Sequence, residues 1–300
     1  MKTRKSTGEV LFNWINILLF SLFALICVFP FYYLFINTIS DNSLVSKGQI
    51  IFLPKGIHFD NYVEILKIKG LSNAAAISIA RTVIGTLLTL VGTSFLGYAL
   101  GKRELWHRKL WYRFVIVTMY FNAGIIPWYI NMKMLRMTDN FLAYVVPRIV
   151  SPFSMILFKT YVESIPASLE ESADLDGAGY ITKFVLLIVP LSTPIIATVA
   201  VFSAVGQWNS FMDTLFLMSD SRLFSLQYML YQYMHEANAL AESLRQAMSQ
   251  GGVVADVTKL LTPTSIKMTV TMAVVLPILL VYPFLQRYFV KGIMIGAVKG

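Results

Sequence analysis

Long apolar runs alternate with shorter polar segments along the whole chain. Six of the runs reach the length of about 20 residues that an α-helix needs to cross the hydrocarbon of a bilayer. They cover Trp14–Ile36, Ala75–Leu100, Leu110–Ile130, Phe141–Tyr161, Phe184–Val205 and Met268–Tyr288. The pattern predicts an all-α, polytopic membrane protein with six transmembrane helices over residues 14–290, preceded by a segment 1–13 and followed by a tail 291–300.

The basic residues predict the orientation of these helices. Lys2, Arg4 and Lys5 precede the first run, the sequence GKRELWHRK follows the second, and Arg287 and Lys291 lie at the end of the last. Basic clusters beside membrane spans favour the cytoplasmic side. Since six spans return the chain to its starting side, we expect both termini and the loop 163–183 in the cytoplasm, and the long segment 207–267 outside.

The long outer segment contains an amphipathic pattern. Apolar residues recur at helical spacing in Leu226, Met229, Leu230, Tyr233 and Met234, and again from Ala237 to Met248, before the sequence SQGGVVAD interrupts them. Two interpretations stay open at this point. The helices either cap the membrane bundle or offer a docking surface to a partner outside the cell.

Composition supports the membrane interpretation and limits the others. The chain of 300 residues is 56% hydrophobic and 14% charged, more apolar than one soluble core requires. Its net charge of +9 comes from short clusters beside apolar runs, which argues against a nucleic-acid partner. Cys27 is the single cysteine, so no disulfide or cysteine metal site can form within the chain. The first run is too long for the core of a signal peptide, and we expect a retained helix.

The motifs of catalysis are missing from the sequence. The three histidines, His58, His107 and His235, are scattered over separate segments, and no zinc-protease, serine-hydrolase or Walker A motif occurs. We therefore expect a chain that is not an enzyme and binds neither metal nor cofactor. If it moves a solute uphill, the energy comes from a coupled ion or from another subunit.

Small residues repeat along one side of the second run. Ser78, Gly85, Gly92 and Ala99 recur every seven residues. A stripe of this kind lets helix backbones approach closely in a membrane. We expect it to form a helix-packing surface.

A polar stretch, EESADLDGAG, separates the fourth and fifth runs. Ser168 and Glu171 have the spacing of a capping box, and Gly177 has the place of a left-handed helix stop. The sequence predicts a helix of about two turns, with Leu169 and Ala173 as a small apolar patch. Because this helix lies between two spans, a protein groove is the natural partner for the patch.

The same stretch resembles the E-A-A-x-x-x-G-x9-I-x-L-P signature of ATP-binding-cassette importer permeases. Glu171, Ser172, Ala173 and Gly177 match it, followed after nine residues by Leu187, Val189 and Pro190. Ser172, Leu187 and Val189 depart mildly from the signature. The sequence GQWNSFMDTLFLM resembles the segment after the fifth span of maltose-type carbohydrate permeases. The sequences MYFNAGIIPWYI and YFVKGIMIGAVKG resemble more specifically the LplC/YtcP-type oligosaccharide permeases.

The resemblance implies a type I importer permease in the bacterial cell membrane. It implies a second homologous permease, two ATPase subunits that carry ATP and magnesium, an extracytoplasmic solute-binding protein and an oligosaccharide cargo as partners. It also implies that an outer-loop stretch contacts the binding protein, and we place that stretch at Gln250, Gly251, Gly252 and Val253. The residues it assigns to ATPase coupling are Leu169, Glu170, Glu171, Ser172, Ala173, Asp174, Asp176, Gly177 and Pro190.

Two arginines interrupt apolar runs. Arg81 lies near the outer end of its span, and we expect its side chain to reach the interface. Arg148 lies deeper, where structural use and solute contact stay open. We place Arg148, Trp208 and Asn209 on the translocation pathway. The alternative is an ion-coupled secondary transporter, which typically carries acidic residues inside its spans.

Overall fold

The computed structural model describes residues 7–236 and 264–297. This part of the chain consists of helices and the turns that join them, without a β-strand. It falls into two compact units, one drawn from residues 1–68 and 233–275 and the other from residues 69–232 and 276–300. The last helix, α15 (Thr264–Ala297), contributes to both units.

The first unit contains α1 (Thr7–Thr38), α2 (Asn42–Ser46) and α3 (Asp60–Lys67). Side chains of α1 are exposed from its start to residue 32, as expected of a helix that lipid covers. Ile36, Val45 and Ile50 form a small core at its end. Asn61 ties the connections together by donating to the Thr38 carbonyl at 3.0 Å.

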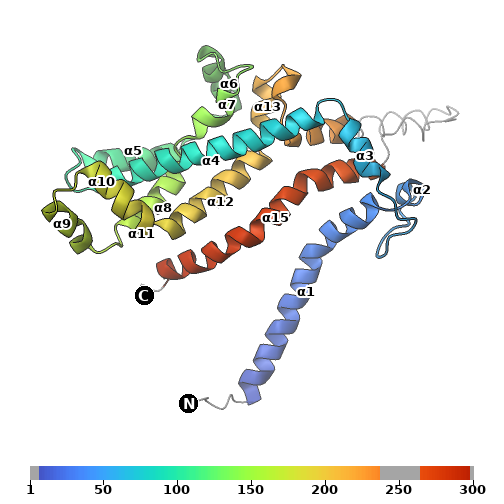
Figure 1. The fold of residues 1–300 in the computed structure, drawn as a ribbon, viewed down its shortest axis with the longest axis horizontal. Coiled ribbons are helices and arrows are strands. Elements are labelled where there is room, and N and C mark those ends of the chain that lie inside the picture. Colours follow the sequence, from blue (N-terminus) through green and yellow to red (C-terminus); the bar gives the residue numbers. More distant parts are fainter. Residues whose placement is uncertain (1–6, 237–263, 298–300) are drawn as a thin grey trace. The chain divides into compact units, whose positions relative to one another are not determined.

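The second unit is built around α4 (Leu71–Gly101), which packs against α8 (Pro152–Val162) and α12 (Thr193–Asn209) (Figure 1). The remaining helical elements of this unit are α5 (Arg108–Tyr120), α6 (Ile125–Met134), α7 (Leu142–Val145), η1 (Val146–Arg148), α9 (Ala167–Leu175), α10 (Tyr180–Lys183), η2 (Phe184–Ile188), α11 (Val189–Leu191), α13 (Met212–Leu217) and η3 (Ser221–Leu223). Residues 226–236 are also helical, as the amphipathic pattern predicts, and of these residues 226–232 belong to this unit, with Leu226 and Met229 buried.

The small-residue stripe on α4 is a packing surface. A Cβ on Gly85 would lie 2.4 Å from Nε2 of Gln207, and one on Gly92 would lie 2.6 Å from Cγ2 of Ile149. A Cβ on Gly97 would lie 3.0 Å from the Met155 carbonyl oxygen. The close approach predicted from the seven-residue spacing is confirmed at Gly85 and Gly92, which meet α12 and the segment before α8. Gly97, outside that spacing, meets α8.

The six apolar runs do not all form straight helices. In the described residues, α1, α4 and α15 contain stretches long and apolar enough to span a membrane, and the number reaches six if each of three bent pairs counts as one span. The bends are 116° between α5 and α6, 43° between η1 and α8, and 82° between α11 and α12. Gly124 has φ +86° at the first bend. Pro152 follows the second and Pro194 follows the third, where proline removes a backbone donor.

Replacing Gly92 by Leu should destabilise the protein by about 1–3 kcal/mol, because the side chain would meet Ile149, whose backbone oxygen would lie 2.9 Å from its Cβ. The thermal unfolding of detergent-purified protein measures the effect. Gly101→Leu is the matched control on the same helix, since its Cβ meets nothing closer than Val162 at 3.9 Å. Equal melting temperatures for both variants would contradict a tight contact at Gly92.

Candidate functional site

The polar stretch between the fourth and fifth apolar runs contains the short helix α9. Gly177 has φ +76° after its last turn. The Gly177 amide donates to the Asp174 carbonyl at 3.0 Å, and the Ala178 amide donates to the Ala173 carbonyl at 2.9 Å. These two bonds form a Schellman motif, so the predicted left-handed stop at Gly177 is confirmed.

The predicted capping box is wrong. The residue before the helix is Pro166, with φ −57°, and no side chain caps the first turn. Pro166 holds the N-cap position with an extended ψ of 127°, and the helix begins at Ala167, earlier than the spacing suggested. Ser168 and Glu171 therefore lie inside the helix, where their side chains cannot satisfy the free amides at its start.

Ion pairs hold α9 to its neighbours. Lys102, just past the end of α4, pairs with Glu170, and Lys183 at the end of α10 pairs with Asp174 at 2.5 Å. Burial, and then the nearby charge of Lys183, lower the pKa of Lys102. The carboxylates of Glu104 and Asp174 oppose this lowering of the pKa. Charge thus ties α9 to the end of α4 and to α10.

The outward face of α9 differs from the predicted apolar patch. Leu169 is 41% exposed, but Ala173 is half-buried. The most exposed apolar side chain is Leu175, at 91%, and it shares a helix face with exposed Glu171 and Ser172. Sequence reasoning missed Leu175, although its spacing of four from Glu171 would have placed it there.

The remaining residues of the predicted coupling set lie away from this face. Asp176 is the exposed residue that ends α9. Pro190 lies in α11, before the 82° bend, and not on α9. The structure therefore brings the residues from Leu169 to Gly177 together and leaves Pro190 in α11.

A buried charge network lies where α4 meets α12 and α13. Arg81 is completely buried, so the expectation that it reaches the interface is wrong. Its guanidinium donates to both carboxylate oxygens of Asp213, at 3.1 and 2.5 Å, and to Oε1 of Gln207 at 3.2 Å. The ring of Tyr144 lies 4.2 Å from the guanidinium carbon. Every side of the arginine head is therefore occupied by protein, and snorkelling is unnecessary.

Asp213 is the functional candidate that sequence reasoning missed. It is a lone carboxylate within the apolar sequence SFMDTLFLM, and only 4% of it is exposed. A buried carboxylate needs a positive partner. The presence of two arginines in apolar runs was the available signal, but the pairing joins residues 132 positions apart.

The contacts of Arg148 fit both roles that the sequence left open for it, structural use and solute contact. Its guanidinium donates to the Ser210 hydroxyl at 2.9 Å and to the Gly206 carbonyl at 3.3 Å. Its distance to Oδ2 of Asp213 is 3.7 Å, and 43% of the side chain is exposed. Arg148 is therefore bonded on one side and open on the other.

The open side of Arg148 faces a cavity of 420 Å³. Residues from η1, α8, α4 and α12 line it, and its polar members besides Arg148 are Thr89, Ser151, Ser154, Ser203 and Gln207. Arg148 is the charged residue among the lining residues. The cavity can thus accept a polar solute with at least one negative group.

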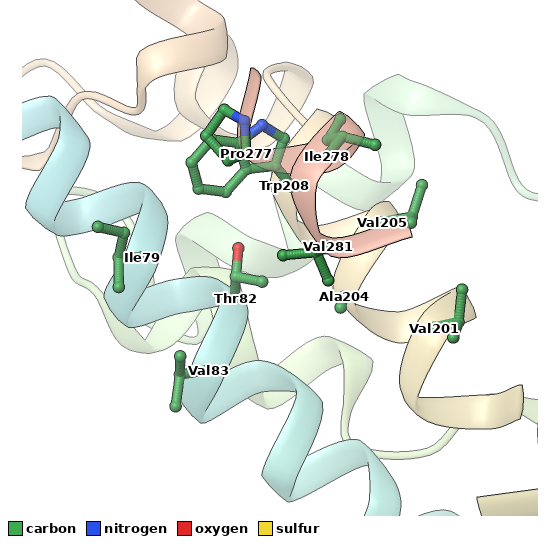
Figure 2. Close-up of a pocket in the computed structure, with 10 residues that line it drawn as sticks. All are labelled: Ile79, Thr82, Val83, Val201, Ala204, Val205, Trp208, Pro277, Ile278 and Val281. Carbon is green, nitrogen blue, oxygen red and sulfur yellow. The ribbon is translucent and has the colours of Figure 1, made fainter. Parts of the chain in front are cut away.

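Trp208 and Asn209 do not line the Arg148 cavity. Trp208 lines a separate pocket of 170 Å³ with Thr82 and Val83 of α4 and Pro277 and Val281 of α15 (Figure 2). The lining of that pocket is almost entirely apolar, which suits packing or lipid better than sugar. Asn209 is exposed at the end of α12.

Gln250, Gly251, Gly252 and Val253 lie outside the described residues. In residues 7–236 and 264–297, no group of three or more His, Cys, Asp or Glu side chains could hold a metal ion.

Removing one member of the buried pair should destabilise the protein strongly. Arg81→Met or Asp213→Leu should each cost about 3–5 kcal/mol, because the remaining charge is buried without its partner. The double variant should recover part of the loss, and thermal unfolding in detergent measures all three. Arg148→Gln is the matched control, since its half-exposed side chain can be replaced at smaller cost. If the double variant is no more stable than the summed losses of the two single variants predict, a direct pairing is contradicted.

Comparison with known proteins places the chain in a family. Residues 93–295 match the family described as "Binding-protein-dependent transport system inner membrane component". The Polygalacturonan/rhamnogalacturonan transport system permease protein YtcP of Bacillus subtilis is 33% identical over 279 residues, covering 93% of this chain and 95% of that protein. Protein LplC of the same organism is 34% identical over 294 residues, covering 96% and 95%.

A solved structure has the same fold. It is a bacterial ABC transporter involved in the import of the acidic polysaccharide alginate, with a TM-score of 0.83 and 28% identity over 96% of this chain and 100% of that chain. The family match covers more than half of the chain, and both relatives cover nearly all of it. The chain therefore belongs to the inner membrane components of binding-protein-dependent transport systems, and it is a multi-pass permease of the plasma membrane with a type I ABC importer fold.

Proposed function

We propose that this chain forms part of the translocation pathway of an ATP-driven importer for oligosaccharides that carry uronate carboxylates. The observation that carries the proposal is Arg148, a half-exposed guanidinium at the wall of a cavity of 420 Å³ that five hydroxyl or amide side chains also line. The name of one relative refers to polygalacturonan and rhamnogalacturonan, and the structural neighbour is involved in the import of alginate. Galacturonan and alginate are both polymers of sugar acids.

The charge balance around Arg148 supports an acidic cargo. Arg81 occupies both oxygens of Asp213 by hydrogen bonds, whereas Arg148 approaches only Oδ2, at 3.7 Å. Two positive charges thus share one negative charge in a site that excludes bulk water on one side. A carboxylate from the cargo would balance the second guanidinium, and charge-assisted bonds of this kind are stronger than neutral ones.

The serine and threonine hydroxyls of the cavity suit the rest of a sugar. Ser203, Ser154 and Ser151 line it beside Thr89, while Phe153 and Phe202 supply apolar surface. Hydroxyl groups can donate to or accept from sugar hydroxyls without preference for one sugar. The arginine supplies selection for acid, and the remaining wall tolerates different sugar units.

The helix α9 is the proposed contact with the ATPase subunits. Its outward face joins exposed Leu175 with Glu171 and Ser172, and its other side is fixed by ion pairs through Glu170 and Asp174. A helix that is fixed to its own chain and exposes one face to a partner can transmit the partner's motion to the membrane helices behind it. This assignment places α9 and both termini in the cytoplasm.

The proposal also assigns the other partners of the transporter. ATP and magnesium belong to two ATPase subunits, a second homologous permease completes the pathway, and an extracytoplasmic binding protein delivers the oligosaccharide to an outer surface that includes residues 250–253. The alternative of an ion-coupled secondary transporter has less support. Its signature would be an acidic residue free to bind the ion, whereas Asp213 is held by Arg81 in the described structure.

The variant Arg148→Gln tests the cargo assignment. It should reduce uptake of uronate-bearing oligosaccharides about tenfold or more relative to neutral ones, since a hydrogen bond to a charged group contributes about 1.5–3 kcal/mol. Uptake of labelled galacturonate and neutral oligosaccharides into proteoliposomes with the complete transporter measures the ratio. Arg222→Gln is the control, because Arg222 is exposed and paired locally with Asp220. Equal losses for both cargo types would assign Arg148 a structural role only.

The variant Gly177→Val tests the contact with the ATPase. A branched side chain is strained at φ +76°, so the end of α9 should shift while the membrane helices stay intact. We expect loss of the ATPase subunits from the purified complex, or ATP hydrolysis without uptake. Gly179→Ala is the matched control two residues later, with φ −70° and open space around its Cβ. Normal ATPase retention together with normal uptake in Gly177→Val would overturn the role of α9.

A further inference from the structure

A strongly basic cavity lies between the end of α4, the start of α5 and α8. It has a volume of 750 Å³. Its lining residues are Arg103, Leu105, His107, Arg108, Lys109, Leu110, Tyr112, Arg113 and Lys159. Five of them carry permanent positive charge, and neither the cargo site nor α9 uses this cavity.

The positive charge of the cavity is only partly balanced. Glu163 is shared by Arg108 and by Lys159, whose Nζ lies 2.7 Å from its Oε2. Arg103, Lys109 and Arg113 form no ion pair with any residue that the structure describes, neighbouring Glu104 included. Because all three side chains belong to exposed residues, their charge is free to meet a ligand.

The surroundings of the cavity are those of a membrane interface. It begins just past Gly101, where α4, one of the helices long and apolar enough to span a membrane, ends. Trp106 is 73% exposed and Trp111 is 46% exposed beside it. Leu110 and Phe114, on the same first turns of α5, are 61% and 59% exposed. Tryptophans and apolar side chains next to basic ones are typical of the headgroup level of a bilayer.

We propose that this cavity binds the headgroup of an anionic phospholipid, with Arg103, Lys109 and Arg113 around the phosphate. Arginine presents a fork of donors that matches phosphate oxygens. The exposed Leu110 and Phe114 would contact the acyl chains that leave the headgroup. A soluble anion would contact the basic side chains but not these apolar ones. An acidic protein would leave the apolar side chains facing lipid. The basic and apolar side chains together therefore favour a lipid as the ligand.

Such a site would anchor the loop between α4 and α5 to the membrane surface. Lys102 in this loop pairs with Glu170 of α9, and Arg108 pairs with Glu163, which lies between α8 and α9. A lipid held by the neighbouring residues would therefore fix the base from which α9 projects. This consequence does not depend on the identity of the cargo.

The test compares lipid retention by the complete transporter in nanodiscs of phosphatidylcholine mixed with phosphatidylglycerol. Retained lipid is measured by mass spectrometry after detergent extraction and purification. The variant Arg103→Gln/Lys109→Gln/Arg113→Gln should lower the retained phosphatidylglycerol by about tenfold or more, because each basic residue near the surface adds attraction to an anionic lipid. Lys47→Gln/Lys55→Gln/Lys133→Gln removes the same charge from exposed positions outside the cavity and should retain the lipid.

Further arms separate the lipid from other anions. If the triple variant does not assemble, Arg103→Gln and Arg113→Gln singly should each show a smaller loss. Inorganic phosphate added to transporter in pure phosphatidylcholine should not replace phosphatidylglycerol in stabilising the complex against heat. Equal retention in the cavity and control variants, full replacement by inorganic phosphate, or loss of an ATPase subunit with unchanged lipid retention would each overturn the proposal.

Discussion

The buried pair of Arg81 and Asp213 is the interaction on which the second unit depends. A guanidinium in the apolar part of a membrane helix is costly unless protein groups replace its water. Here a carboxylate, the amide of Gln207 and the ring of Tyr144 surround it completely. Those groups come from α13, α12 and α7, so satisfying one charge fixes three elements against α4. Their relative positions then follow from the geometry of one side chain.

This arrangement needs the close approach that glycine allows. Gln207 reaches Arg81 because Gly85, one turn along α4, leaves space for its side chain. Gln207 also donates to the Tyr144 carbonyl at 3.2 Å. The contact between Gly85 and Gln207 thus serves both helix packing and the hydrogen bonding of Arg81. Gln207 also lines the Arg148 cavity. The site proposed for cargo therefore inherits its shape from the structural network beside it.

The proposed cargo site and the proposed ATPase contact are joined by α8 and α12, which both pack against α4. Ser154 of α8 and Ser203 of α12 line the Arg148 cavity. At its other end α8 leads into α9 through Glu163, which pairs with Arg108 and Lys159. A motion imposed on α9 can therefore reach the Arg148 cavity through α8, which lines the cavity and leads into α9.

Local sequence determined much of this protein by itself. The apolar runs located the helices, the small-residue spacing of α4 located its packing surface, and Gly177 located the end of α9, because each depends on neighbours in the chain. The family signature needed no structure either, since its residues are close in sequence. The bends inside three of the runs and the start of α9 at Ala167 also have local signals, Gly124, Pro152, Pro194 and Pro166, but their effect shows only in the structure. Tertiary structure alone decided that Arg81 is buried. It also decided the partner of Arg81, because burial and charge pairing join residues far apart in sequence, and no local pattern records which distant carboxylate a buried arginine will meet.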